Sequence, residues 1–424
     1  MAGASAGEGS RRTPSSAGVL GASVISGVSG YAVLVLIARH LTLAENSRFL
    51  VFWGLLFGLF GCLGGVQAEA ARTVRAAQVT PGPPAPPGRR TGPTVGTVSV
   101  VVGLTGGVLV LASASLWGEE VFGSPWWAEA TATAIGVAGF AGYSGLSGCE
   151  IGSGAYRRYA GLLTTDGVGR LVLVALAIVG SGSVLALTWA TALASCGWLC
   201  WVASCPQTRR AWSAPADVSA AHLVGRMAVA CSATAASAAL VVGFPVLVRV
   251  TTSDEVYAGA APVLLALALT RAPLLVPLTA YQGVLVARVV SDGIRPLGRL
   301  LGLLTAVTVG GVPVAWAAGP WLLRVVNPEY LVAGQVFAGL TLGAGLIAAL
   351  TMTGAACLGL SGHGAYAAGW LAATAASLAL LALALPLPTR VVVALVGGPV
   401  LGIGVHLAWL VAHRRGRGAQ GDTA

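Results

Sequence analysis

The chain has very few charged residues and contains no lysine. Only 9% of its 424 residues are charged, whereas about a quarter are charged in a typical soluble domain. This shortage, together with a mean hydropathy of +0.83, excludes an ordinary soluble globular protein. All 24 basic residues are arginines, and a GC-rich genome explains that bias without reference to function.

Residues that bind metals are also scarce. Three of the seven cysteines, Cys196, Cys200 and Cys205, lie close together, but no histidine or acidic residue accompanies them. We interpret them as small thiols within helices, and predict no metal site and no cofactor. Nucleic-acid binding is not expected either, because the arginines behind the net charge of +10 lie at predicted helix ends and form no continuous basic face.

Long apolar runs dominate what is present. Hydrophobic residues make up 56% of the chain, in runs of about 20 residues, the length needed to cross a membrane. The first run lacks a convincing signal-peptide cleavage site. We predict an all-α polytopic membrane protein of about twelve transmembrane helices. The predicted spans are 18–38, 49–68, 95–116, 127–147, 167–180, 183–203, 224–248, 258–287, 299–319, 332–358, 364–385 and 390–412.

The arginines predict the orientation of these spans, because loops facing the cytoplasm carry an excess of basic residues. With the N-terminus inside, most arginines fall in cytoplasmic segments and Arg271 is embedded. We therefore predict a multi-pass protein of a bacterial plasma membrane with both termini in the cytoplasm. A wrong number of spans would break the alternation, which supports twelve. The few arginines in predicted outer segments are Arg39, Arg48, Arg249, Arg324 and Arg390.

The chain resembles itself at a shift of about 210 residues, close to half its length. An even number of helices in each half gives both halves the same orientation, so the repeat is parallel. We predict two six-helix lobes, 1–210 and 211–424, around a central cavity. The matching residues are Arg39, Thr42 and Glu45 with Arg249, Thr252 and Glu255, and Gly152, Gly154, Ala155 and Tyr156 with Gly362, Gly364, Ala365 and Tyr366.

Arg271 lies near the middle of a predicted span. A charge at this depth costs about 2.5–3.5 kcal/mol on insertion scales, so we expect it to face a water-filled cavity or a partner. Pro273 and Pro277 follow it and favour a bend. The alternative is an arginine that pairs with a carbonyl or carboxylate only to hold helices together. Gln282, about three turns further on, shares a similar helix face and could contact a sugar or pack between helices.

Two pairs of charged residues are further candidates for substrate binding. Asp166 and Arg170, spaced i and i+4, are predicted to pair at the cytoplasmic start of the fifth span, or only to anchor that helix end. Glu69 and Arg72 follow the second span and could engage an anionic headgroup, or simply obey the positive-inside rule. The second span contains glycines that permit close helix approach, namely Gly54, Gly58, Gly61, Gly64 and Gly65.

Three segments carry a resemblance to a known family. They are Ile37 to Thr42 leading to Phe52 to Gly54, the turn from Gly148 to Tyr159, and Arg271 to Leu274 followed by Tyr281 to Gly283. With twelve helices in two parallel halves, the chain resembles the MOP flippase superfamily (multidrug, oligosaccharidyl-lipid and polysaccharide exporters) along essentially its whole length. Within it, the chain is most similar to bacterial O-antigen-type polysaccharide flippases.

The resemblance implies a transporter and not an enzyme. A polyprenyl-(pyro)phosphate-linked oligosaccharide would move from the inner to the outer leaflet by alternating access, for the synthesis of cell-surface polysaccharide. Arg271, and also Arg170 and Arg72, would hold its phosphates. The implied partners are this lipid-linked oligosaccharide, membrane lipids, a coupling ion (H+ or Na+) and other polysaccharide-assembly proteins.

Three other functions stay open at this point. A non-transporting scaffold or assembly subunit would predict no solvated cavity around Arg271. A drug or metabolite exporter of the MATE type is disfavoured, because spans 18–38 and 224–248 contain none of the carboxylates that this branch typically uses for ion coupling. A membrane enzyme of polysaccharide assembly would need acidic or histidine groups on a sizeable outer loop. The predicted outer loops are short and their carboxylates are scattered: Glu45, Glu119, Glu120, Asp254, Glu255 and Glu329.

Overall fold

The computed structural model describes residues 14–79, 93–271 and 295–421. These residues form helices with short connections, and within these ranges no β-strand occurs apart from one isolated bridge between Thr94 and Pro215. Helices satisfy their backbone hydrogen bonds internally, which the hydrocarbon core of a membrane requires. The chain is an all-α, multi-pass membrane protein, as predicted.

The helices follow the order of the predicted spans. The first half contains α1 (Pro14–His40), α2 (Leu43–Val79), α3 (Val95–Phe122), α4 (Trp127–Gly152), α5 (Tyr156–Gly180), α6 (Val184–Leu193), the 3-10 turn η1 (Ala194–Cys196), α7 (Trp198–Ser204) and α8 (Pro206–Trp212). The second half contains α9 (Ala220–Val241), α10 (Phe244–Val250), α11 (Asp254–Tyr257), the helix Ala261–Arg271, α13 (Arg295–Val326), α14 (Gly334–Gly359), α15 (His363–Leu381) and α16 (Leu387–Gly421).

Ten stretches among the described residues are long and apolar enough to cross a membrane. The helix Ala261–Arg271 is a shorter apolar helix that borders the residues outside the described ranges, and α4 is not one of the ten. The predicted number of twelve spans is therefore not confirmed, although the described part of each predicted span is mainly helical, with breaks in 183–203 and 224–248.

The fifth predicted span, 167–180, is too short at its start. Helix α5 begins at Tyr156, about 16 Å of helix earlier at 1.5 Å per residue. The charged residues in this stretch are typical of a loop, so the sequence predicts that the helix begins after them. In the structure Arg158 is neutralised by Glu150 of α4, with 2.8 Å between Nε and Oε2, so the charge does not prevent a helix here.

The seventh predicted span, 224–248, is broken in the middle. Helix α9 ends at Val241 and α10 begins at Phe244. Pro245 lies in the first turn of α10 and has no N–H group, so the Val241 carbonyl cannot receive the usual bond from the residue four positions later. The break therefore leaves a backbone acceptor unused inside the membrane-spanning region.

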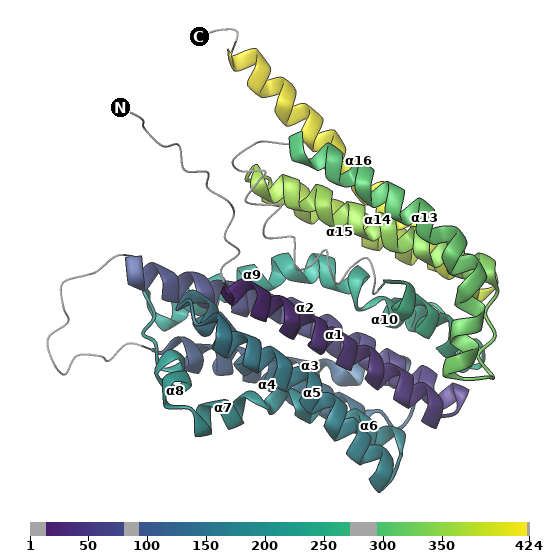
Figure 1. Ribbon diagram of the computed structural model, residues 1–424, viewed down its shortest axis with the longest axis horizontal. Coiled ribbons are helices and arrows are strands. Elements are labelled where there is room, and N and C mark those ends of the chain that lie inside the picture. Colours follow the sequence, from purple (N-terminus) through teal and green to yellow (C-terminus); the bar gives the residue numbers. More distant parts are fainter. Residues whose placement is uncertain (1–13, 80–92, 272–294, 422–424) are drawn as a thin grey trace, which may run out of the picture.

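The helices form two bundles that meet at one end and diverge toward the other (Figure 1). Helices α1 to α8 make up the first bundle, α13 to α16 pack together in the second, and α9 and α10 lie between them. We name the end with the turn between α1 and α2 the Thr42 end. The opposite end, which carries the segment 205–219 between the halves, is the linker end.

Helices α2 and α9 pack closely along a row of glycines. A Cβ atom on Gly61 would lie 2.9 Å from the Cβ of Ala238, and one on Gly65 would collide with the α9 backbone at Ala230 and Cys231. Gly64, in contrast, faces open space. The predicted close helix approach at the glycines of the second span is confirmed for the row Gly54, Gly58, Gly61 and Gly65.

The linker is attached to the first bundle. The Val95 N–H donates to the carbonyl of Ala214 at 3.0 Å, and the Ala216 N–H donates to the carbonyl of Pro93 at 3.2 Å. The Trp212 ring stacks on Trp198, with 4.7 Å between ring centroids. The predicted boundary between 210 and 211 thus falls inside α8, which packs on the first bundle.

Candidate functional site

Arg271 lies where the break between α9 and α10 exposes a backbone carbonyl. Its Nη1 donates a hydrogen bond of 2.6 Å to the carbonyl oxygen of Val241, the acceptor that Pro245 leaves unused. The guanidinium also lies over the Phe244 ring, with 5.4 Å between Cζ and the ring centroid. The side chain of Arg271 thus supplies the hydrogen-bond donor that the helix break denies to the Val241 carbonyl.

The rest of the Arg271 guanidinium has no partner among the residues that the structure describes. Its Nε and Nη2 are buried without a hydrogen bond, and its side chain forms no ion pair within that part of the chain. The two other buried arginines differ, because Arg170 pairs with Asp166 and Arg249 with Asp254. Among described residues, Arg271 is thus a buried cation without a carboxylate.

The surroundings of Arg271 differ from the expected open chamber. The residue is 6% exposed and packs against protein. The carbonyl partner fits the alternative that this arginine holds helices together, but the two unpaired nitrogen atoms do not. Pro273, Pro277 and Gln282 lie outside the described residues.

Asp166 and Arg170 form a buried ion pair in the middle of α5. Oδ1 and Nη2 are 2.8 Å apart, and the two side chains are 11% and 5% exposed. The guanidinium lies 4.8 Å from the centroid of the Phe57 ring of α2. The pair was expected at the start of the helix, and this position is wrong because α5 begins at Tyr156. The pair lies inside the first bundle.

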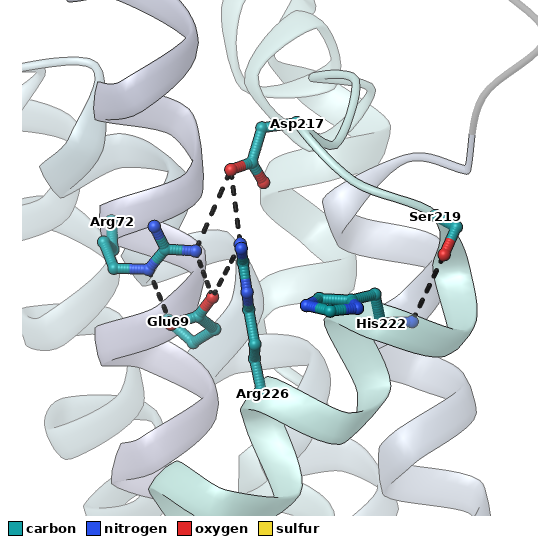
Figure 2. Close-up of polar contacts among 6 residues, drawn as sticks. All are labelled: Glu69, Arg72, Asp217, Ser219, His222 and Arg226. Atoms are coloured by element: carbon teal, nitrogen blue, oxygen red, sulfur yellow. Dashed lines mark hydrogen bonds and ion pairs between the residues drawn. The ribbon is translucent and has the colours of Figure 1, made fainter.

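Glu69 and Arg72 belong to a cluster of four charges at the linker end (Figure 2). Arg72 Nε donates to Glu69 Oε2 at 2.8 Å. Arg226 of α9 reaches both acidic residues, with 3.3 Å to Asp217 Oδ2 and 3.8 Å to Glu69 Oε1. Arg72 Nη2 lies 3.9 Å from Asp217 Oδ2. The alternating charges connect α2, the linker and α9.

The cluster changes the interpretation of Arg72. Its charge is already matched by Glu69 and Asp217, so it has little capacity left for a phosphate. Asp217 and Arg226 were not among the site residues predicted from the sequence. The available signal was an isolated acidic residue in an otherwise basic connecting segment.

The predicted site residues that the structure describes lie in three separate groups. No hydrogen bond or ion pair between described residues joins Arg271, the pair in α5 and the cluster at the linker end. Val241 and Phe244, which contact Arg271, were also not predicted. The sequence Gly243-Phe244-Pro245 was the signal for a helix break at that point.

The chain is similar to two mycobacterial proteins along nearly its whole length. Uncharacterized protein Rv3630 of Mycobacterium tuberculosis is 39% identical over 393 residues, which cover 92% of this chain and 90% of that protein. Uncharacterized protein Rv1510 of the same species is 38% identical over 387 residues, covering 90% and 88%. No protein-family model matches the chain.

Solved structures of membrane transporters share its fold. An inward-facing multidrug resistance MATE family transporter of the MOP superfamily superposes with a TM-score of 0.68, at 14% identity, over 94% of this chain and 99% of that chain. The lipid II flippase MurJ, in an inward closed conformation, superposes with a TM-score of 0.67, at 10% identity, over 92% and 86%. The chain belongs to the family of the mycobacterial proteins Rv3630 and Rv1510, and it has the fold of MOP superfamily transporters.

Proposed function

We propose that the protein is a flippase that moves a polyprenyl-(pyro)phosphate-linked oligosaccharide from the inner to the outer leaflet by alternating access. The observation that carries this proposal is the buried guanidinium of Arg271, which has two unpaired nitrogen atoms and no carboxylate among the described residues. An unpaired charge within a membrane is costly. A phosphate group supplies a negative charge and oxygen acceptors for both nitrogen atoms at once.

The position of Arg271 suits a substrate that enters between the bundles. It contacts the break between α9 and α10, the elements that lie between the two bundles. The bundles diverge toward the linker end (Figure 1). We place this arginine-rich end in the cytoplasm by the positive-inside rule, so that the structure corresponds to a state that receives its substrate from the inner leaflet.

The charges of the chain argue against a cationic drug as the substrate. Helices α1 and α9 contain no aspartate or glutamate, so they offer no carboxylate to a cation. A buried arginine would also repel a positively charged compound. A MATE-type drug or metabolite exporter, whose fold the chain shares, is therefore the weaker alternative.

Several carboxylates at the Thr42 end are occupied by neighbouring groups, which argues against an enzyme at that surface. Glu45 accepts hydrogen bonds from Thr42, while Glu129 pairs with Arg48 and Asp254 with Arg249. A general acid or base needs a carboxylate within reach of a substrate proton. These three are instead engaged in holding helix ends and side chains.

Transport of a defined glycolipid in proteoliposomes tests the proposal. The substrate is a fluorescent short oligosaccharide on polyprenyl pyrophosphate, and the readout is the fraction that an external quencher reaches over time. We expect wild-type protein to speed the exchange of the glycolipid between leaflets. Arg271→Ala should lower this rate at least about tenfold, and Arg271→Lys should retain part of it.

A control arginine and two control substrates make this test specific. Arg324→Ala should transport normally, because Arg324 is exposed and, among the described residues, donates only to Pro320 of its own helix. A polyprenyl glycoside without phosphate should not be moved. Normal glycolipid transport by Arg271→Ala, or export of a cationic dye in place of the glycolipid, would contradict the proposal.

A further inference from the structure

Arg39 connects the end of α1 to the end of α13. Its Nε donates to the carbonyl of Val326 at 3.1 Å and its Nη2 to that of Val325 at 3.0 Å. Helix α13 ends at Val326, so these carbonyls have no partner within their own helix. A positive charge at a helix C-terminus also interacts favourably with the helix dipole.

A residue of the second half makes a reciprocal contact with the end of α1. Asn327, directly after α13, donates from Nδ2 to the carbonyl of Ala38 at 2.7 Å. Ala38 lies in the last turn of α1, so its carbonyl also lacks a partner four residues later within the helix. Each of the two helix ends is therefore capped by a side chain from the other half of the chain.

Arg249 makes the corresponding contact in the opposite direction. It lies in the last turn of α10, and its Nε donates to the carbonyl of Val121 at 3.2 Å, near the end of α3. The residue four positions after Val121 is Pro125, which has no N–H group, so this carbonyl is also free. Arg249 is 7% exposed. In its own half of the chain it donates hydrogen bonds to Asp254 and to the carbonyl of Thr252.

The two arginines occupy equivalent places in the internal repeat. Arg39 and Arg249 match at the shift of about 210 residues, and each ends the first spanning segment of its half. Helices α3 and α13 form the third predicted span of the first and second halves. Each half thus uses the same arginine to cap the third span of the other.

Other arginines at the Thr42 end bond only within their own half. Arg48 pairs with Glu129 and donates to the carbonyl of Pro125. Arg390 donates to Thr251 and Thr252. Crossing between the halves is therefore a property of the two repeat-equivalent arginines and not of every arginine at this end.

We propose that Arg39 and Arg249 are paired clasps that hold the two halves together at the Thr42 end and release when that end opens. The proposal rests on the alternating access of the proposed function, but not on the identity of its substrate. Helix carbonyls and guanidinium groups are readily solvated by water once they separate. The clasps are therefore reversible, which suits a gate that opens in every cycle.

Distances between spin labels across the Thr42 end test the clasps. The labels are placed on Ala44→Cys of α2 and Leu331→Cys of the loop before α14, both exposed, in a variant whose native cysteines are replaced. The protein is studied in lipid nanodiscs without substrate. We expect the parent to give one short distance.

Removing the clasps should add a population with a longer distance. Hydrogen bonds to a charged group are strong enough that Arg39→Ala or Arg249→Ala should each shift the ratio of closed to open molecules by about tenfold. The double variant should shift it by about the product, since the two contacts lie at separate helix ends. Arg39→Lys should keep part of the effect through a single donor.

The matched control is Arg48→Ala, which removes an arginine from the same end without a contact between halves. It should leave the distance unchanged. An unchanged distance in the double variant, or an equal shift in Arg48→Ala, would overturn the proposal. A monodisperse elution profile and an unfolding temperature near the parent show that each variant is folded. Failure to move a glycolipid would refute the proposed function and leave this measurement intact.

Discussion

Arg170 donates a hydrogen bond to Asp166 one turn earlier in α5, with 2.8 Å between Nη2 and Oδ1, in the middle of a membrane-spanning helix. Both side chains are almost fully buried, so each charge depends on the other for compensation. The pair also lies beside the Phe57 ring of the neighbouring helix. A buried pair of this kind has clear consequences for stability.

Breaking this pair should cost more than replacing it. Asp166→Ala or Arg170→Ala alone leaves one buried charge and should destabilise the protein by about 3–5 kcal/mol. The double variant Asp166→Leu with Arg170→Met buries no charge and should recover most of this loss. Thermal unfolding in detergent, followed by the elution of folded protein, measures the difference. A double variant as unstable as the single ones would contradict this prediction.

Arg271→Met should abolish transport without lowering stability. The wild-type guanidinium has one carbonyl partner and no carboxylate among the described residues. An apolar side chain of similar length removes an unpaired charge, which offsets the cost of leaving the Val241 carbonyl without its donor. Transport and thermal unfolding are measured on the same preparation. A loss of stability as large as that of Arg170→Ala would show that Arg271 mainly holds helices together.

Two adjacent glycines of α2 should respond differently to alanine. Gly65 meets the α9 backbone, which cannot move aside, so Gly65→Ala should force the helices apart and destabilise by about 1–3 kcal/mol. Gly64 faces open space, and Gly64→Ala should be neutral or stabilise by up to about 1 kcal/mol through helix propensity. Unfolding temperatures of the two variants give the comparison, and equal values would contradict the close packing.

The cluster at the linker end should depend mainly on Glu69. This carboxylate is 8% exposed and lies between Arg72 and Arg226, so Glu69→Gln leaves the two arginines facing each other. We expect a larger fall in unfolding temperature than for Asp217→Asn, whose side chain is more exposed. High salt should reduce the effect by screening the repulsion. Equal effects of the two variants would show that burial does not set the strength of the cluster.

The sequence predicts the order of the helical segments better than their ends. Apolar runs are local, so the described part of every predicted span is mainly helical, although 183–203 and 224–248 are each interrupted. The predicted start of the fifth span was wrong because a charged residue such as Arg158 is typical of a loop. Its partner in α4, Glu150, cannot be identified from local sequence. The break in the seventh span was missed although Gly243 and Pro245 signal it.

Contacts between distant segments are harder to predict from the sequence than the helices themselves. The repeat identified Arg39 and Arg249 as equivalent residues, but their partners are backbone carbonyls, which every residue has. Arg226 reaches Glu69 because α9 packs on α2, and Asp217 reaches Arg72 and Arg226 because the linker folds back on these helices. Such contacts depend on the packing of the bundles and leave no local pattern.

The attachment of the linker limits where the molecule can bend. Backbone bonds fix Ala214 and Ala216 to the start of α3, and the glycine row holds the following helix against α2. The connection between the halves is therefore fixed to the first bundle, and α9 is expected to move with that bundle in a rocking motion. Gly54 and Gly58 of the same row meet Pro245 and Gly243, so the start of α10 and the Val241 carbonyl that Arg271 binds are expected to move with α2 as well.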